Sequence, residues 1–440
     1  MIPRGLLVVA VAGSVVLTAA APATAELDLA RTGRISVASN GSQADAGSGL
    51  TGPPSLSATG RFVAFVSSAT NLVPGDTNGF VDVFVRDRVT RSTTLVSVAS
   101  DGTQADGDSF LPTVSGDGRY VAFGSFASNL VPGDTNGESD VFVRDRWAGT
   151  TRLISMSSVG EQGNRLSGDP EISLNGRFVT FYSFASNLVP KDTNGDGDVF
   201  VRDQVTNTTT LVSVATDGTQ GDNSSSGPSI SADGRYVAFD SSATNLVPED
   251  TNGTDDVFVR DRMAGTTTRV SVATDGTQAD ERSLVPAISA DGRFVAFGSD
   301  ATNLVAGRTT GVSNVFVHDR LTRETTQASV ANDGSTADAP LFDYHPGISA
   351  NGRFVAFTSF ASNLVPGDTN MVSDAFVRDR WAGTTTRTSV SDTGAQADDF
   401  SYQVAISAQG LDTAFVSAAS NLVPGDTNGV NDVFIRRRSN

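Results

Sequence analysis

Aspartate and asparagine recur at a fixed spacing in a short loop of this 440-residue chain. The first copy reads Asp76-Thr-Asn78-Gly-Phe-Val-Asp82, so side-chain oxygens stand at relative positions 0, 2 and 6. Carboxylate and amide oxygens are the hard ligands that Ca²⁺ prefers, and Ca²⁺ tolerates flexible geometry. The spacing therefore predicts a calcium site in each intact copy. These copies are Asp76, Asn78, Asp82; Asp134, Asn136, Asp140; Asp192, Asn194, Asp198; Asp250, Asn252, Asp256; Asp368, Asn370, Asp374; and Asp426, Asn428, Asp432.

An Asx turn explains the same loop without any metal, because Asp and Asn cap their own backbone and Asn-Gly suits turn conformations. Both interpretations stay open. In the fifth copy all three positions change together, to Arg308, Thr310 and Asn314. This joint change indicates that the three side chains act as one unit around positive charge, either a metal ion or the arginine of the exceptional copy.

A second candidate site lies in the insertion that distinguishes the sixth copy of the repeat described below. It contains Asp343, Tyr344 and His345, which are residue types capable of acid–base catalysis. An exposed loop histidine is the plainer explanation, because no second histidine or repeated acid completes a catalytic set. A hydrolase or lyase that uses these three residues is therefore the alternative function, and a non-enzymatic protein is the leading one.

An internal repeat positions both sites. The string Gly-Arg-Phe-Val-Ala-Phe, first seen at Gly60, recurs in close or weakened form at intervals of 58 residues, or 60 between Gly292 and Gly352, giving seven copies. Each copy contains four short runs rich in Val, Phe, Tyr and Thr, separated by Gly, Asn, Asp and Pro, which predicts four strands. Runs such as Val-Phe-Val require cover on both faces of a sheet. The pattern predicts an all-β, seven-bladed β-propeller of four-stranded antiparallel blades over residues 26–440.

The two ends of the chain complement each other. The last copy lacks a fourth strand, and residues 34–39 read as a fourth strand without a blade. We expect this N-terminal strand to complete the C-terminal blade, which closes the ring and removes exposed sheet edges. Alternating connections then place His345 near the mouth of the central channel, on the same face as the Asp-Thr-Asn-Gly loops.

Two further features of the repeat concern its turns. We expect the Arg-Asp-Arg triplets of the third strands to pair with the arginine of the Gly-Arg turns. Trp147 and Trp381 occupy a turn position that is aliphatic in other copies. Packing against a neighbouring blade is the expected role of these tryptophans, and stacking on sugar rings is the alternative.

The string Ser231-Ala-Asp-Gly-Arg-Tyr-Val-Ala-Phe239 resembles the TolB-type, WD40-like β-propeller repeat of bacterial exported proteins. The resemblance covers almost the whole repeat region and implies the propeller fold. Family members usually carry Pro before Asp-Gly, where this chain has Ala232, and the Asp itself varies between copies. The repeats leave no room for the α/β domain that TolB carries before its propeller. We therefore expect a propeller alone, without TolB's role in envelope translocation.

Composition narrows the function. The chain has 31 basic and 49 acidic residues, a formal net charge of −18, and no cysteine. Such a surface repels nucleic acid and anionic lipid. Residues 1–25 read as a secretory signal peptide, and no later run is apolar enough to span a membrane. We expect a secreted monomer that acts as a binding or scaffold propeller and recognises a protein or a cell-wall polysaccharide. Ca²⁺ stabilises it if the acidic loops bind metal, and no cofactor is expected if they form Asx turns alone.

Overall fold

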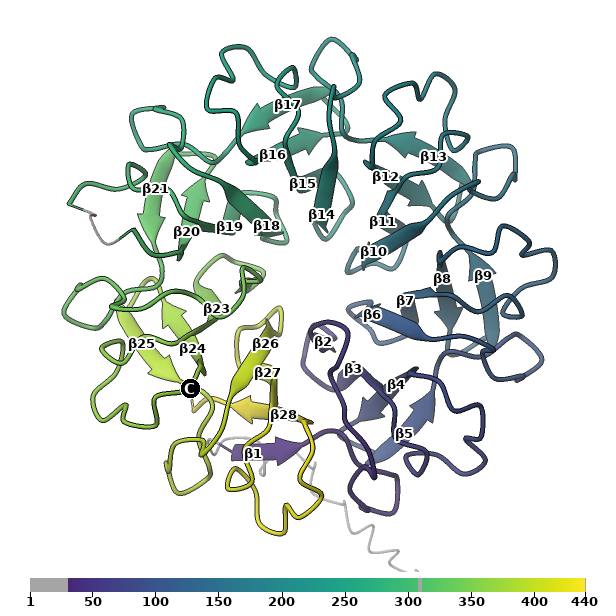
Figure 1. The fold of residues 1–440 in the computed structure, drawn as a ribbon, viewed down its shortest axis with the longest axis vertical. Helices are drawn as coiled ribbons and strands as arrows, with labels where there is room; N and C mark the ends of the chain where they lie inside the picture. The colour runs from purple at the N-terminus through teal and green to yellow at the C-terminus, as the bar shows by residue number, and fades with distance from the viewer. Residues whose placement is uncertain (1–30, 308–310, 440) are drawn as a thin grey trace, which may run out of the picture.

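The computed structural model describes residues 31–307 and 311–439. It contains seven four-stranded antiparallel sheets arranged around a central axis (Figure 1). The predicted all-β, seven-bladed propeller is therefore confirmed. The signal peptide expected over residues 1–25 lies outside the described residues.

The strands occupy four concentric positions. The innermost are β2 (Ser55–Leu56), β6 (Ser109–Val114), β10 (Ser167–Ile172), β14 (Ser225–Ile230), β18 (Ser283–Ile288), β22 (Gly347–Ile348) and β26 (Ser401–Ile406). The second are β3 (Phe62–Ser67), β7 (Tyr120–Ser125), β11 (Phe178–Ser183), β15 (Tyr236–Ser241), β19 (Phe294–Ser299), β23 (Phe354–Ser359) and β27 (Asp412–Ser417). The third are β4 (Asp82–Asp87), β8 (Asp140–Asp145), β12 (Asp198–Asp203), β16 (Asp256–Asp261), β20 (Asn314–Asp319), β24 (Asp374–Asp379) and β28 (Asp432–Arg437). The outermost are β5 (Ser92–Leu95), β9 (Thr150–Leu153), β13 (Thr208–Leu211), β17 (Thr266–Arg269), β21 (Glu324–Gln327), β25 (Thr384–Arg387) and β1 (Arg31–Arg34).

Apolar residues at consecutive strand positions are buried because neighbouring blades cover both faces of each sheet. In β4, Val83, Phe84 and Val85 are fully buried. Seven hydrophobic clusters lie between adjacent blades. Each blade also stacks two phenylalanines across its second and third strands, as Phe239 does on Phe258 with ring centroids 5.8 Å apart. The core is therefore distributed around the ring, at about 1.5–3 kcal/mol for each large side chain buried.

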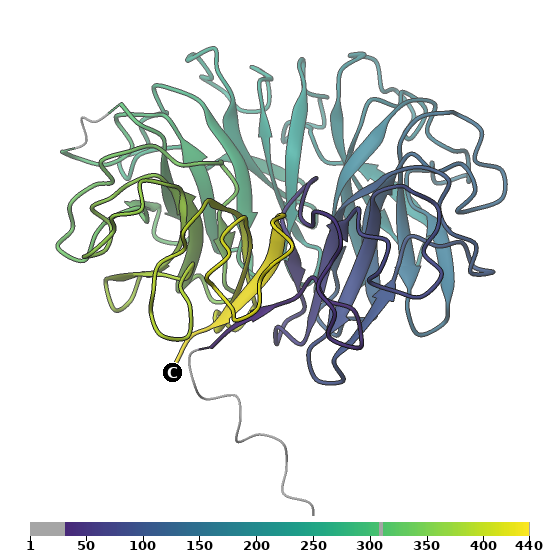
Figure 2. The same ribbon diagram turned by 60° about the horizontal axis from the view of Figure 1, so that its bottom comes forward.

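The N-terminal strand β1 completes the sheet that contains the C-terminal strand β28 (Figures 1 and 2). The two strands are antiparallel, with Gly33 opposite Ile435. The N–H of Ile35 also donates to the carbonyl of Val433 over 2.7 Å. The predicted closure of the ring is confirmed.

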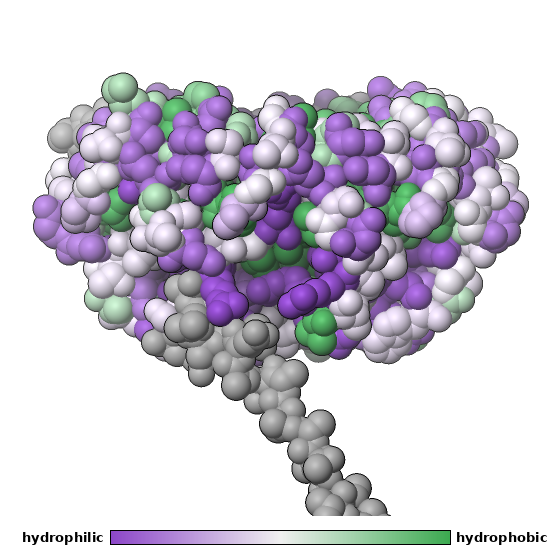
Figure 3. All heavy atoms as spheres, turned by 90° about the horizontal axis from the view of Figure 1, so that it is seen from below, coloured by the Kyte–Doolittle hydropathy of each residue, from purple (hydrophilic) through white to green (hydrophobic). Residues whose placement is uncertain are grey.

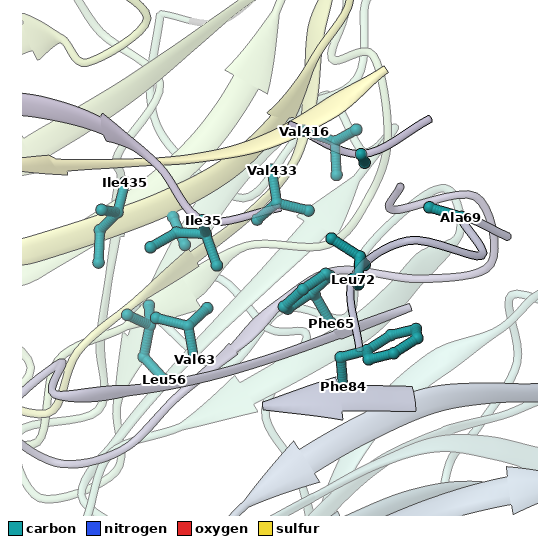
Figure 4. Close-up of a cluster of buried hydrophobic side chains, with 12 residues drawn as sticks. Ile35, Leu56, Val63, Phe65, Ala69, Leu72, Phe84, Val416, Val433 and Ile435 are labelled. Atoms are coloured by element: carbon teal, nitrogen blue, oxygen red, sulfur yellow. The ribbon is translucent and has the colours of Figure 1, made fainter. Parts of the chain in front are cut away.

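The contact that closes the ring is packed like the other blade interfaces. Figure 4 shows Ile35 among Leu56 and Val63 of the first blade and Val433 and Ile435 of the last. All five side chains belong to one buried cluster. The closure therefore stabilises the ring by apolar packing as well as by hydrogen bonds.

The outer strands end earlier than the sequence predicted. A strand was expected over residues 34–39, whereas β1 spans Arg31–Arg34, so the expected bounds were wrong and share only Arg34 with the observed strand. The Oγ of Ser36 accepts the N–H of Val433 at 3.1 Å, in place of a backbone carbonyl. The equivalent serines of the other six blades accept the corresponding N–H groups. The main chain can therefore leave the sheet without exposing an unpaired donor.

The Gly-Arg turns are fastened to the third strands, as expected. In the fourth blade Nε and Nη2 of Arg235 donate to the two carboxylate oxygens of Asp261 at 3.0 and 2.7 Å. The hydrogen bond from Arg235 lowers the pKa of Asp261. The same ion pair occurs in Arg61–Asp87, Arg119–Asp145, Arg177–Asp203, Arg293–Asp319 and Arg353–Asp379.

The two tryptophans do not pack against neighbouring blades, so that expectation was wrong. Trp147 and Trp381 are 65% and 64% exposed. The guanidinium groups of Arg119 and Arg353, from the same blades, lie 5.2 Å from their ring centroids. The turn projects into solvent, so its side chain meets the arginine of the adjacent turn rather than another blade.

The side of the molecule seen in Figure 3 is mainly hydrophilic, with small separate apolar areas. Among the described residues, no helix has the length and apolar character needed to cross a membrane. The apolar residues of the chain are concentrated between the blades instead.

Candidate functional site

A cavity of about 290 Å³ lies on the propeller axis, among the innermost strands. Proline and aliphatic side chains form most of its wall. The ionisable residues on the wall are Asp169, Glu171 and His345. The repeating scaffold therefore encloses an asymmetric set of ionisable groups, which is what a specific site requires.

Bulges in the innermost strands shape this cavity. In five blades the pairing of the first and second strands shifts register around one residue with positive φ. A bulge of this kind redirects a side chain out of the regular alternation of the strand. The bulge residues are Leu111, Asp169, Gly227, Val285 and Gln403.

Carboxylates of the preceding blade hold three of the bulges. Oδ1 of Asp240 accepts the N–H of Val285 at 3.0 Å. Oδ2 of Asp343 accepts the N–H of Gln403 at 3.1 Å. Asp169 faces the bulge of the fourth blade, where the N–H of Gly227 acts to lower its pKa. These three acids therefore join blades and satisfy backbone donors at the strained positions.

Glu171 replaces a short polar side chain that links blades elsewhere. In the second blade, Oγ1 of Thr113 accepts the N–H of Ile172 at 3.1 Å. The carboxyl group of Glu171 hydrogen-bonds to the N–H of Ile230 and to Ser229 in the fourth blade. Glu171 thus keeps the link between blades and adds an acid to the cavity wall.

Desolvation by the channel wall raises the pKa of Glu171 to about 8 and that of Asp169 to about 6. Burial also raises the pKa of Asp240. Positive charge on His345 acts against the rise at Asp169 and Asp240. Near neutral pH the wall therefore presents a protonated acid and an ionised one two residues apart, which is an arrangement suited to donating and accepting hydrogen bonds.

The structure directs the side chains of the three predicted residues to different partners. Asp343 serves the bulge described above. The Tyr344 hydroxyl donates to Oδ1 of Asp300 at 2.7 Å and accepts from Nη2 of Arg282 at 3.1 Å. His345 lines the cavity. Of the three predicted residues, only His345 therefore faces the same cavity as Asp169 and Glu171, which we call the channel acids.

An aromatic cluster, made of Phe342, Phe360, Phe400 and Tyr402, adjoins the insertion of the sixth blade. The ring centroid of Phe342 lies 5.4 Å from that of Phe360, 6.4 Å from that of Phe400 and 5.5 Å from that of Tyr402. The three phenylalanines are 38–40% exposed. Such rings offer solvent-accessible faces for stacking.

Sequence analysis missed Asp169, Glu171 and Asp240. A signal for them exists in the repeat. The position of Asp169 holds no acid in the other copies, as in Leu111 and Val285, and Glu171 stands among small residues. A position-by-position comparison of the copies, applied to every strand rather than to the loops, would have singled out all three acids.

In the outer loops the asparagine forms an Asx turn. In the first blade Oδ1 of Asn78 accepts the N–H of Phe80 at 3.2 Å. Its Nδ2 donates to Oδ2 of Asp82 at 2.8 Å and to the carbonyl of Ala105 at 3.1 Å. Oδ1 of Asp82 accepts from Ser97. The Asx-turn explanation therefore accounts for the presence of Asn78 and for hydrogen bonds to both carboxylate oxygens of Asp82, and it leaves Asp76 unexplained.

In three blades an arginine lies between the two carboxylates of the loop. Nη1 of Arg269 lies 3.2 Å from Oδ1 of Asp250 and 3.3 Å from Oδ2 of Asp256. The other two sets are Arg387 with Asp368 and Asp374, and Arg34 with Asp426 and Asp432. The space between the carboxylates thus accommodates positive charge, as the sequence pattern indicated.

In the other intact copies the arginine position is Leu95, Leu153 or Leu211. In the second and third blades a glutamine amide bridges the two carboxylates. Nε2 of Gln162 lies 2.7 Å from both Oδ1 of Asp134 and Oδ2 of Asp140. In the third blade Nε2 of Gln220 bridges Asp192 and Asp198 at 2.9 and 2.8 Å. The glutamine amide therefore gives each carboxylate of these two pairs a hydrogen bond, but it supplies no positive charge.

In the exceptional fifth copy an asparagine, Asn314, replaces the second aspartate of the loop. Oδ1 of Asn314 accepts hydrogen bonds from Gln327 at 2.7 Å and Ser329 at 2.8 Å. Arg308 and Thr310 lie outside the described residues. Within residues 31–307 and 311–439, no group of three or more His, Cys, Asp or Glu residues could hold a metal ion. A metal at these loops would therefore depend on a carboxylate pair with further oxygen ligands.

The remaining acids of this face cap loops. Asp106 accepts the N–H of Ser128 at 2.7 Å and its hydroxyl at 2.9 Å. Asp222 and Asp280 make the same pair of bonds in their blades. The acidity of the face therefore arises in part from structural requirements of its loops.

Known proteins share the fold of this chain. No protein-family model and no curated protein sequence matches it. An oligogalacturonate lyase in complex with manganese aligns with a TM-score of 0.57 and 11% identity over 92% of each chain. The β-propeller domain of the Trilobed protease from Pyrococcus furiosus, which has an open velcro topology, aligns at 0.52 and 12% over 87% of this chain and 93% of that one.

TolB from Acinetobacter baumannii is also similar, with a TM-score of 0.43 and 15% identity over 75% of this chain. The chain spans 64% of the length of that TolB chain. The alignments with the lyase and with the Trilobed protease domain show a shared propeller fold, and at 11% and 12% identity they show the fold alone.

Proposed function

We propose that this protein is an exported, non-enzymatic binding propeller that recognises a cell-wall polymer at the mouth of its central channel. One observation carries the proposal: the insertion of the sixth blade joins an exposed aromatic cluster to His345, and this sector of the channel mouth faces Asp169 and Glu171 of the third blade across the cavity. Specific recognition requires unlike groups converging on one place.

The chemistry of this sector suits a carbohydrate chain. The exposed faces of Phe342, Phe360 and Phe400 offer stacking surfaces for the apolar faces of sugar rings. Asp169, Glu171 and His345 offer hydrogen-bond donors and acceptors for hydroxyl or amino groups. A net charge of −18 favours neutral or amino-sugar polymers over strongly anionic ones.

Co-sedimentation with insoluble peptidoglycan tests this proposal. Replacing Phe360 by Ala removes one stacking face, and we expect about tenfold weaker retention, which corresponds to about 1.4 kcal/mol. Phe126 supplies the matched control. It occupies the equivalent position in the second blade and stacks on Phe110 with the same 5.4 Å centroid distance and 46° interplanar angle as Phe342 and Phe360.

The proposal requires that Phe126→Ala binds like the unmodified protein. Equal losses in both variants, or none in either, would contradict it. A different outcome would point to a protein partner for the acidic face. In that case an added basic protein would abolish retention by peptidoglycan, and Phe360→Ala would have no effect.

A second candidate is a hydrolase or lyase at the channel mouth, favoured by the unlike pKa values of Glu171 and Asp169. A protonated acid beside an ionised one can donate and accept protons in turn. In this candidate His345 faces the substrate, and Asp343 and Tyr344 position the insertion. Release of soluble fragments from the sedimented polymer, lost in Glu171→Gln, would favour this candidate.

A further inference from the structure

The carboxylate pairs of the outer loops can be compared with one another within the same molecule. In the fourth, sixth and seventh blades a guanidinium lies 3.1–3.4 Å from both carboxylates. These arginines share one register, because Arg269 pairs with Phe258, Arg387 with Phe376 and Arg34 with Phe434. The fold thus repeatedly places a cation between these two side chains.

The first blade has the same pair and no arginine. Leu95 occupies the arginine position, opposite Phe84. Asp82 is fully buried, and the negative charge of Asp76 acts on it. In the repeat these two residues are equivalent to Asp250 and Asp256, whose carboxylates lie 3.2 and 3.3 Å from the same guanidinium nitrogen of Arg269. Among the described residues, no Lys or Arg lies within ion-pair distance of Asp76 or Asp82. The pair therefore carries two acids without a counter-charge.

Asp76 is also without a polar partner. Its side chain is buried, with the residue only 8% exposed, and its carboxylate makes no hydrogen bond with the described residues. The glutamine that bridges the pair in the second and third blades is turned away here, since Nε2 of Gln104 donates to the carbonyl of Gly75 at 2.9 Å. A largely buried carboxylate without a partner in the protein is costly unless water, a proton or a cation accompanies it.

We propose that Asp76 and Asp82 bind a divalent cation of the Ca²⁺ type in the space that a guanidinium fills in the three arginine-bearing blades. Two carboxylates match the charge of such an ion and supply hard oxygen ligands. Oδ1 of Asn78, which accepts one hydrogen bond from Phe80, retains a second lone pair that could face the ion. Water completes the coordination shell, as is usual for Ca²⁺ in exposed loops.

Calorimetric titration of the purified, chelator-treated protein with CaCl₂ tests the proposal. Leu95→Arg should place a guanidinium between Asp76 and Asp82, as Arg269 does for its pair, and we expect the number of bound Ca²⁺ ions to fall by one. Leu95→Met, which keeps an apolar side chain of similar size, should leave the number unchanged. Arg387→Leu removes the internal cation of the sixth blade and should raise the number by one.

The two arginine exchanges act in opposite directions, so misfolding of one variant does not leave the proposal untested. Circular dichroism checks that each variant retains its sheets. The proposal is overturned if the unmodified protein binds no Ca²⁺, or if Leu95→Arg binds as many ions as Leu95→Met. An unchanged number in Arg387→Leu would also count against it.

Discussion

The glycine of each Gly-Arg turn has two separate reasons to be glycine. Gly234 has a φ of +77°, a conformation that side chains disfavour. A Cβ on this residue would also lie 2.1 Å from Cδ2 of Phe178 in the preceding blade. The turn therefore sets both the local backbone and the distance between blades.

Gly234→Ala should consequently destabilise the protein by about 2–5 kcal/mol, combining about 1–2 for the backbone with about 1–3 for overpacking. Urea unfolding measures this loss. Gly253→Ala is the matched control, because Gly253 has a φ of +68° and no atom within 4 Å of the added Cβ. A loss of equal size in the two variants would show that contact between blades contributes nothing at this glycine.

Residue types predicted some contacts and not others. The Arg235–Asp261 pair could be predicted, because both residues recur at the same place in most copies. The partner of Asp343 could not be predicted. The N–H of Gln403 lacks a partner within its own sheet only because a bulge forms in the seventh blade, and Asp343 of the sixth blade then accepts it. Spacing along the chain does not reveal where a buried backbone donor will need an acceptor.

At the scale of the strand, β1 differs from the other outermost strands because it comes from the opposite end of the chain. Its pairing with β28 covers an edge that would otherwise present free N–H and C=O groups. Ile35 extends this pairing into the buried cluster between the first and last blades. Ring closure therefore depends on a short segment.

Removing all residues up to and including Ile35 should lower the free energy of unfolding by about 3 kcal/mol or more, since a buried Ile and one strand of pairing are lost. Size-exclusion chromatography should also show association through the exposed edge of β28. A protein that begins at Arg31 retains β1 and is the control. Equal stability and monomeric behaviour of the two truncated proteins would contradict this role of β1.

Strand number and order could be predicted from the repeat, because apolar runs and turn residues alternate in every copy. The ends of the outermost strands could not be. The serine that follows each of them, such as Ser36, accepts a backbone N–H through its side chain, so the strand stops while the hydrogen bonding continues. A run of Val and Ser alone does not distinguish these two ways of satisfying a donor.

At the scale of the molecule, buried acids give stability an unusual dependence on pH. Burial raises the pKa values of Asp82, Asp198, Asp368 and Asp169 to about 6 and that of Glu171 to about 8. The folded protein therefore binds protons more tightly than the unfolded chain at these groups. Their contribution is present at low pH and is lost as pH rises through the folded-state values.

In chelator-containing buffer we expect the melting temperature to rise as pH is lowered from 8 to about 5. His318 opposes this trend as a single group, because burial lowers its pKa to about 4. Below pH 4 stability should fall again, as the arginine-paired Asp87 and Asp261, whose folded-state pKa values are lowered, become protonated. Calorimetry across this range is the measurement, and a melting temperature that decreases steadily from pH 8 to 5 would contradict it.

The central channel was the part of the molecule least accessible to sequence reasoning. His345 could be placed at its mouth from the insertion and the order of connections. Asp169 and Glu171 escaped notice because they lie on a strand, and only ring closure and the bulge bring them opposite a residue more than 170 positions away in the sequence.

The proposed binding sector is tested most directly by hydrogen–deuterium exchange of the protein with and without soluble peptidoglycan fragments. We predict slower amide exchange confined to residues 341–346, 359–361 and 398–404, which carry the aromatic cluster and the channel mouth, and to residues 168–172, which carry the channel acids. Slower exchange around the exposed turns of Trp147 and Trp381, or no change at saturating fragment, would contradict the placement of the site.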